Sequence, residues 1–228
     1  MTGKVTADNI MRWDSLFAGR AWGQYPPEEL VRFLARTFPD KAARRGMRAL
    51  EVGCGGGANL WLLAREGFQI AGIDGSSHAV RMTKEKLRSE GLAMPSDDLK
   101  VGNFASLPWQ DQSFDAVVDI EAISANVMST IQATIAEGFR VLKPGGWFFS
   151  KMFGPKTWGL DSGNFLEPGT IDNPTSGPLK DIGLIHAFTK EEIQTLLSGF
   201  INVSINWVHR GDRNGKHEIF EWIVQAQK

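Results

Sequence analysis

A glycine-rich bend between an apolar strand and a helix constrains this chain more than any other feature. The stretch ALEVGCGGGANLWLLAREG, residues 49–67, runs from a short apolar segment into four glycines among five residues and then into a helical pattern. Backbone without side chains at the end of a strand lets a ligand approach closely. The bend therefore predicts an α/β domain that binds a nucleotide-like cofactor.

The order of the predicted elements supports this fold class. Strands are predicted over 47–52, 68–73, 99–101 and 114–120 and in PGGWFFSKMF, with helices over 57–66, from Ser76 or Ser77 to Glu90, and near 129–140. The early strands are continuous apolar runs, which is typical of a parallel sheet covered on both faces.

The last part of the chain has a different pattern. Thr189 and Glu192 form a predicted capping box for a helix that ends near Ser198. INVSINWV and HEIFEWIVQA follow as two strands with so short a link that one must be antiparallel. We expect a doubly wound, mostly parallel seven-stranded sheet closed by a C-terminal antiparallel hairpin, a Rossmann-like α/β fold.

We expect one domain over residues 1–228. Within it we predict an N-terminal helical cap over 1–45, a cofactor-binding core over 47–152, and a C-terminal helix and hairpin over 188–228. The segment 153–187 is dense in glycine, proline, asparagine and aspartate, so we expect a long irregular loop that acts as a substrate lid.

Composition excludes several classes of function. A net charge of −1 offers no general attraction to nucleic acid or to an anionic membrane. The single cysteine, Cys54, rules out an internal disulfide and a cysteine-based metal cluster. No segment has the apolar length of a membrane span, and the N-terminus has no signal-peptide core. We expect a cytoplasmic monomer or homodimer that takes a small molecule, without metal, nucleic acid or membrane partners.

Two cofactors fit the glycine bend. Gly53, Gly55 and Ala58 satisfy the dinucleotide pattern G-x-G-x-x-G/A, and Asp74 ends the second strand where a ribose-binding acid belongs. Glu51, however, lies two residues before Gly53, where its carboxylate would repel a pyrophosphate. S-adenosylmethionine carries an ammonium and a sulfonium, which an acid at this position suits.

Further motifs follow in order along the chain. They are the acid in GIDGS, the segment GNFASLPW, the strand and turn FDAVVDIEAI, and RVLKPGG before the fifth strand. With LEVGCGGG, these motifs make residues 47–152 resemble the class I S-adenosylmethionine-dependent methyltransferases, in particular their bacterial small-molecule branch. The resemblance implies methyl transfer to oxygen or nitrogen of a small-molecule acceptor by in-line displacement.

The resemblance also implies roles for matching positions. The methionine half of the cofactor would lie against Glu51 and the bend residues Gly53, Cys54, Gly55 and Gly57, with Cys54 serving packing rather than nucleophilic attack. The ribose would lie against Asp74, Gly75 and Ser76, the adenine against Asn103 and Phe104, and the cofactor ammonium against the chain at Asp119, Ile120 and Glu121. Many relatives carry aspartate at the position of Asn103, and an amide still accepts from the adenine amino group.

Residues outside the core complete the predicted site. Tyr25 and Arg20 precede a helix in an aromatic N-terminal segment, from which they could bind the methionine carboxylate. Trp22, Asn126 and Trp158 are predicted to line the acceptor site. His186, at the end of the expected lid, is the candidate general base, whereas His209 and His217 flank a surface turn. Two alternatives stay open: an NAD(P)-dependent oxidoreductase, and a non-catalytic protein that retains the fold.

Overall fold

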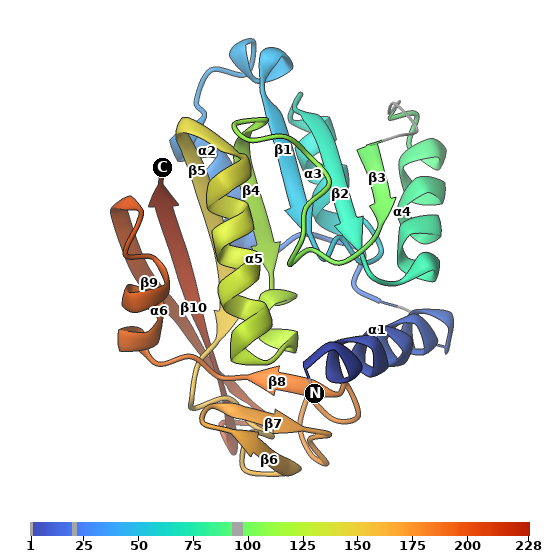
Figure 1. Cartoon of the computed structure of the whole chain (residues 1–228), viewed down its shortest axis with the longest axis vertical. Coiled ribbons are helices and arrows are strands. Elements are labelled where there is room, and N and C mark those ends of the chain that lie inside the picture. The colour runs from blue at the N-terminus through green and yellow to red at the C-terminus, as the bar shows by residue number, and fades with distance from the viewer. Residues whose placement is uncertain (1, 20–21, 93–97) are drawn as a thin grey trace.

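The computed structural model of the chain describes residues 2–19, 22–92 and 98–228 and contains a seven-stranded sheet in the order β3-β2-β1-β4-β5-β10-β9 (Figure 1). The strands are β1 (Arg48–Val52), β2 (Gln69–Asp74), β3 (Leu99–Val101), β4 (Phe114–Ile120), β5 (Leu142–Phe153), β9 (Ile201–Asp212) and β10 (His217–Gln227). Pairing is parallel from β3 to β5, and β10 runs antiparallel to both β5 and β9. The predicted sheet and its closing hairpin are confirmed.

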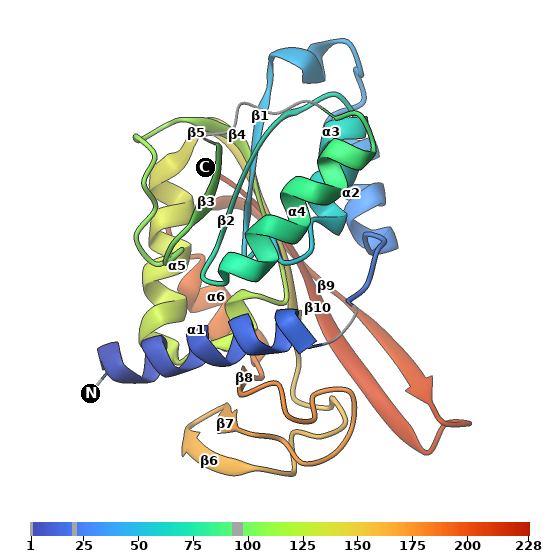
Figure 2. The ribbon, with the colours of Figure 1, turned by 90° about the vertical axis from the view of Figure 1, so that its right-hand side faces the viewer.

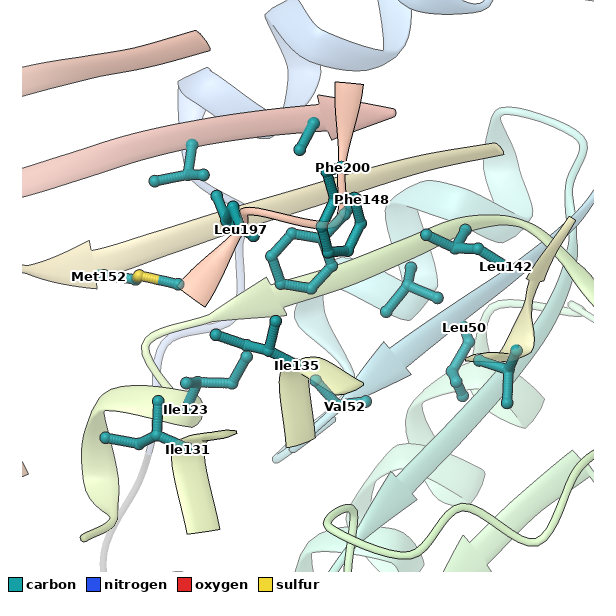
Figure 3. Packing of buried hydrophobic residues seen from close by; sticks show 14 of the residues in the cluster. Leu50, Val52, Ile123, Ile131, Ile135, Leu142, Phe148, Met152, Leu197 and Phe200 are labelled. Atoms are coloured by element: carbon teal, nitrogen blue, oxygen red, sulfur yellow. The ribbon is translucent and has the colours of Figure 1, made fainter. Parts of the chain in front are cut away.

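Helices cover both faces of this sheet. On one face pack α2 (Glu28–Thr37), α3 (Ala58–Arg65) and α4 (Ser77–Ser89), and on the other α5 (Met128–Val141) and α6 (Lys190–Leu196). Figure 3 shows the second layer, in which Ile131 and Ile135 of α5 and Leu197 after α6 meet strand residues such as Leu50 and Phe148. The predicted capping box of α6 is present, with both of its hydrogen bonds. Within the described ranges, no helix has the length and apolar character needed to cross a lipid bilayer.

The first helix, α1 (Thr2–Gly19), lies across the ends of the parallel strands toward which their arrows point (Figures 1 and 2). Asn9 Nδ2 donates to the carbonyl of Ala125, 2.8 Å away, in the short helix η3 (Ile123–Ala125) that follows β4. At the other side, Asp14 Oδ1 accepts from Ser76 Oγ at 2.7 Å, at the start of α4. Helix α1 thus closes the edge of the sheet at which a doubly wound fold binds its ligand.

The segment 153–187 is only in part the irregular loop that its composition suggested. It forms a second, antiparallel sheet of three strands, β6 (Asn164–Glu167), β7 (Thr170–Asp172) and β8 (Leu184–His186), below α1 in Figure 1. Gly169 lies in the turn between β6 and β7, where it has a φ of 76°, and a Cβ there would lie 2.6 Å from His186 Cε1. The connections 154–163 and 173–183 are irregular, as the glycine and proline content predicted, whereas the three short strands were not expected. That this segment acts as a substrate lid stays a prediction.

Candidate functional site

A cavity of about 420 Å³ lies between the parallel strand ends, α1 and the second sheet. Its size falls within the range of small-molecule sites, about 300–1,000 Å³. The order of the sheet reverses between β1 and β4, and ligands of doubly wound folds bind at the carboxyl ends of strands at such a point. Of the residues predicted from the sequence, the cavity is lined by Trp22, Tyr25, Glu51, Gly53, Cys54, Gly55, Asp74, Gly75, Ser76, Asn103, Phe104, Ile120, Glu121 and Asn126.

The glycine bend is required by close contact as well as by backbone conformation. Gly53 has a φ of 67°, and a Cβ there would lie 2.1 Å from the Cβ of Ala122, which follows β4. Gly55, with a φ of 50°, faces Phe17 of α1, whose Cζ would be 3.3 Å from an added Cβ. Gly57 does not line the cavity. A Cβ added there would lie 2.8 Å from Thr83 of α4, so the absence of a side chain at Gly57 lets the start of α3 pack against α4.

Glu51 presents an unsatisfied acceptor to this cavity. Its side chain is 1% exposed, and Asn59 Nδ2 donates to its Oε1 over 2.6 Å. Its Oε2 and the Oδ1 of Asn59 have no hydrogen-bond partner among the described residues. Burial, followed by repulsion from Asp74 and Asp119, raises the pKa of Glu51 well above its ordinary value. A bound cation or hydrogen-bond donor would satisfy both oxygens and stabilise the ionised form.

Asp74 is held in place by backbone donors. Its Oδ2 accepts from the Gly55 N–H at 2.9 Å and its Oδ1 from the Ser76 N–H at 2.8 Å, which ties the glycine bend to the end of β2. Burial raises the pKa of this carboxyl, opposed by these two hydrogen bonds. Each oxygen keeps a further lone pair for a ligand hydroxyl. Ser76 caps α4 and donates to Asp14, so its hydroxyl is already occupied.

The chain after β3 forms another wall. Asn103 Oδ1 accepts from the Ala105 N–H at 2.9 Å, which fixes the turn that carries Phe104. Phe104 is partly buried against the core and also lines the cavity. Cys54 is buried, and burial raises the pKa of its thiol well above the ordinary value, so the thiol stays protonated as a packing group.

Helix α1 and the segment after it supply an aromatic wall that sequence reasoning identified only in part. The rings of Trp13, Phe17 and Trp22 form a cluster with centroids 4.8–5.9 Å apart. Tyr25 lies at the mouth of the cavity and is 82% exposed. Arg20, predicted beside it, lies outside the described residues. Sequence reasoning missed Asn9, Ile10 and Phe17, although the apolar spacing within α1 was a signal for a buried face.

A network of charged side chains lies at the end of the cavity nearest β9 and β10. Lys151 Nζ is 3.1 Å from Glu121 Oε1 and 3.0 Å from Glu221 Oε1. Arg210 Nη1 is 2.6 Å from Glu221 Oε2. Glu121, Glu221 and Arg210 all line the cavity. Sequence reasoning missed Lys151, Arg210 and Glu221, because only the pairing of β4, β5, β10 and β9 brings them to Glu121.

Two predicted residues lie away from the cavity in structural roles. Asp119 is fully buried, accepts from Ser150 Oγ at 2.5 Å and from the Ile123 N–H at 2.9 Å, and so fixes the turn after β4. Burial raises its pKa to about 7. Trp158 lies between β5 and β6 and stacks on His217 with ring centroids 3.8 Å apart, so it packs against the start of β10 and is not among the residues that line the cavity.

His186 is also not among the residues that line the cavity. It is fully buried on β8, and its Nδ1 is 2.7 Å from the hydroxyl of Thr170 on the neighbouring strand. Its Nε2 is 3.7 Å from a carboxylate oxygen of Glu192. Burial lowers its pKa, opposed by Glu192 and Glu167. Because a general base must reach the acceptor, the placement of His186 does not suit that role.

The charges around the cavity suit a cationic ligand. Among the described lining residues, four carry carboxylates, Glu51, Asp74, Glu121 and Glu221, and one carries a guanidinium, Arg210. A pyrophosphate would meet acids at the glycine bend and the ribose position. The unsatisfied Glu51 Oε2 and the further lone pairs of Asp74 can accept hydrogen bonds from an ammonium and from a diol, groups that S-adenosylmethionine carries.

Comparisons with known proteins agree with this geometry. Residues 50–150 match the model of a family described as a methyltransferase domain. The chain is 38% identical over 109 residues to 24-methylenesterol C-methyltransferase 2 of Oryza sativa subsp. japonica, a match covering 47% of this chain and 29% of that protein. It is 31% identical over 149 residues to a fatty-acid O-methyltransferase of Mycolicibacterium smegmatis, covering 59% and 52% respectively.

Among solved structures, a SAM-dependent methyltransferase of Methanosarcina mazei is similar with a TM-score of 0.64 and 28% identity, covering 80% of this chain and 92% of that one. The matches span about half or less of the length of the two curated relatives. The family model itself covers residues 50–150, which include the glycine bend and the strands β2 to β4. Residues 50–150 thus match a methyltransferase domain, and the fold is similar to that of a solved SAM-dependent methyltransferase.

Proposed function

We propose that this protein transfers a methyl group from S-adenosylmethionine to nitrogen or oxygen of a small-molecule acceptor. The observation that carries the proposal is the buried Glu51 Oε2, an acceptor without a partner among the described residues, in the wall of a cavity beside the glycine bend. A cavity built for a phosphate-bearing dinucleotide would present donors at this position rather than a carboxylate. The oxidoreductase alternative therefore has no support in this lining.

Each wall of the cavity has a role in this proposal. Glu51 and Asn59 would receive the cofactor ammonium, and Asp74 would bind both ribose hydroxyls. Phe104 would cover the adenine, with Asn103 beside its amino group. The bare backbone of Gly53 and Gly55 leaves room for the methionine half. Tyr25, at the mouth, would contact the methionine carboxylate.

The remaining walls would hold the acceptor. They comprise Trp22, Asn126, β8 with the turn before it, and residues of β9 and β10. S-adenosylmethionine supplies a methyl group that its sulfonium already activates. What the chain must add is alignment of the acceptor and exclusion of water, which account for much of the acceleration in reactions of this kind. Helix α1 closes the cavity on the solvent side and suits that task.

The proposal is tested by transfer of a labelled methyl group. The protein is incubated with S-adenosylmethionine labelled in the methyl group and with fractionated metabolites, and the product is identified by its gain of one methyl mass. We expect a labelled small molecule modified at nitrogen or oxygen. A product labelled at carbon would keep the activity and change the acceptor atom; absence of labelled product, together with absence of cofactor binding, would contradict the proposal.

A further inference from the structure

The charged network beside the cavity is built from four neighbouring strands. Glu121 follows β4, Lys151 lies on β5, Glu221 on β10 and Arg210 on β9, and these strands lie side by side in the sheet (Figure 1). Lys151 and Glu221 are both buried. Burying charged side chains has a large desolvation cost, so a network that is only structural could be replaced by apolar packing. Because three of its members line the cavity, we infer that the network contributes to ligand binding.

The two carboxylates of this network differ in accessibility. The Glu221 side chain is 2% exposed and contacts two cations, Lys151 and Arg210. The Glu121 side chain is 33% exposed, lines the cavity and contacts Lys151 alone among the described cations. Glu121 also has a φ of 65°, a costly conformation for a residue with a side chain, and such residues occur often at functional sites. Glu121 is therefore the member of the network that offers an oxygen to a ligand.

The pKa values of Glu121 and Glu221 shift in opposite directions. Burial, together with repulsion by and hydrogen bonding to Glu221, raises the pKa of Glu121 to about 7, although Lys151 opposes the rise. The pKa of Glu221 is lowered despite its burial, because Lys151, Glu121 and Arg210 favour its ionised form. Asp119, two residues before Glu121, adds a further acid on β4. Glu121 is thus the carboxyl of the pair that exchanges a proton near neutral pH.

The rest of this end of the cavity is apolar. Phe153 at the end of β5, Leu179 and Ile182 before β8, Ile185 on β8 and Ile219 on β10 line it. The first four belong to one buried apolar cluster. An acceptor that fills this space needs an apolar body. Arg210, which also lines this end, is paired with Glu221. The accessible oxygen is therefore that of Glu121, which would repel a carboxylate on that body and attract an ammonium.

We propose that the methyl acceptor is an amine with an apolar body, and that Glu121 binds its nitrogen as an ammonium and then receives its proton. This inference rests on the proposed function. The proton moves from the ammonium to a carboxylate oxygen of Glu121. The nitrogen lone pair then forms the bond to the methyl carbon as the carbon–sulfur bond breaks, and S-adenosylhomocysteine leaves. Lys151 and Glu221 act as positioning residues that hold Glu121 at the cavity wall.

Three small molecules with the same phenyl body test the proposal: 2-phenylethylamine, 2-phenylethanol and phenylacetate. Their binding to the full chain saturated with S-adenosylhomocysteine is measured by calorimetry at pH 6 and pH 8. At pH 8 we expect the amine to bind about tenfold or more tightly than the alcohol or the acid, because hydrogen bonds to charged groups are the strong ones. At pH 6 the advantage should shrink, because Glu121 is then mostly protonated while an alkyl amine keeps its charge.

Two variants test whether Glu121 is the residue that gives the preference for the amine. Glu121→Gln should lose the preference for the amine and its pH dependence while S-adenosylhomocysteine still binds. Glu218→Gln, an exposed glutamate of β10 paired with His209, should keep both. The inference is overturned if the acid or the alcohol binds as tightly as the amine, if none of the three binds, or if Glu121→Gln keeps the preference. Failure of S-adenosylhomocysteine itself to bind wild-type protein would instead overturn the proposed function.

Discussion

Replacing Gly53 by alanine tests the claim that the bend is bare because β1 and β4 must meet there. Gly53 has a φ of 67°, and its added Cβ would lie 2.1 Å from Ala122 Cβ, an atom that cannot move without its backbone. Gly91 is a matched control, because its φ is 66° and an added Cβ would meet nothing within 4 Å. The left-handed conformation costs a residue with a Cβ about 1–2 kcal/mol. Overpacking adds about 1–3 kcal/mol.

We therefore expect Gly53→Ala to lower the free energy of unfolding by about 2–5 kcal/mol, and Gly91→Ala by about 1–2 kcal/mol. Urea denaturation of wild type and both variants measures the two losses. Gly53→Ala should also weaken binding of S-adenosylhomocysteine, because Gly53 and the displaced Ala122 both line the cavity. Equal losses of stability in the two variants would refute the steric argument.

Three further predictions concern the cofactor wall, the α1 contact and the second sheet. Asp74→Asn should weaken S-adenosylhomocysteine binding about tenfold or more in calorimetry, because one charged acceptor of the ribose is lost; unchanged affinity would contradict the ribose assignment. Hydrogen bonding to the His78 backbone holds the pKa of Asp14 below its ordinary value of 3.8, despite partial burial. The stability that Asp14 adds is complete above that value and is lost as pH falls below it, so Asp14→Asn should flatten the acid side of the stability curve; an unchanged curve would count against this contact. His217→Ala should lower the free energy of unfolding by about 0.5–1.5 kcal/mol, because it removes the stack on Trp158, and should leave cofactor affinity unchanged. A loss of affinity in calorimetry would indicate that Trp158 contributes to the binding site.

The parallel core could be predicted because its signals are local. The strand predicted over 68–73 is observed as Gln69–Asp74, and the helix predicted to end near Glu90 ends at Ser89. A continuous apolar run that indicates a strand, and a glycine that ends a helix, can each be recognised from neighbouring residues in the sequence. The second sheet could not be predicted in the same way, because strands of three or four residues are too short to show a period.

The same distinction between local and long-range signals applies to the residues of the site. Glu51, Gly53 and Asp74 could be predicted to lie together, and they do line the cavity, because the glycine bend and the ends of β1 and β2 are visible in the sequence. Lys151, Arg210 and Glu221 reach Glu121 only through strand pairing across β5, β10 and β9, which no local pattern encodes. His186 was misplaced for the converse reason: its position in the sequence does not reveal that β8 is buried on both sides.

The central claim is that the cavity beside Gly55 receives a cationic sulfur compound and no pyrophosphate. Calorimetric titration of the unmodified chain with S-adenosylmethionine, and separately with NADH, tests it most directly. We expect S-adenosylmethionine to bind one molecule per chain and NADH to give no binding heat at the same concentrations. Binding of NADH with higher affinity than S-adenosylmethionine, or no binding of S-adenosylmethionine, would contradict the account.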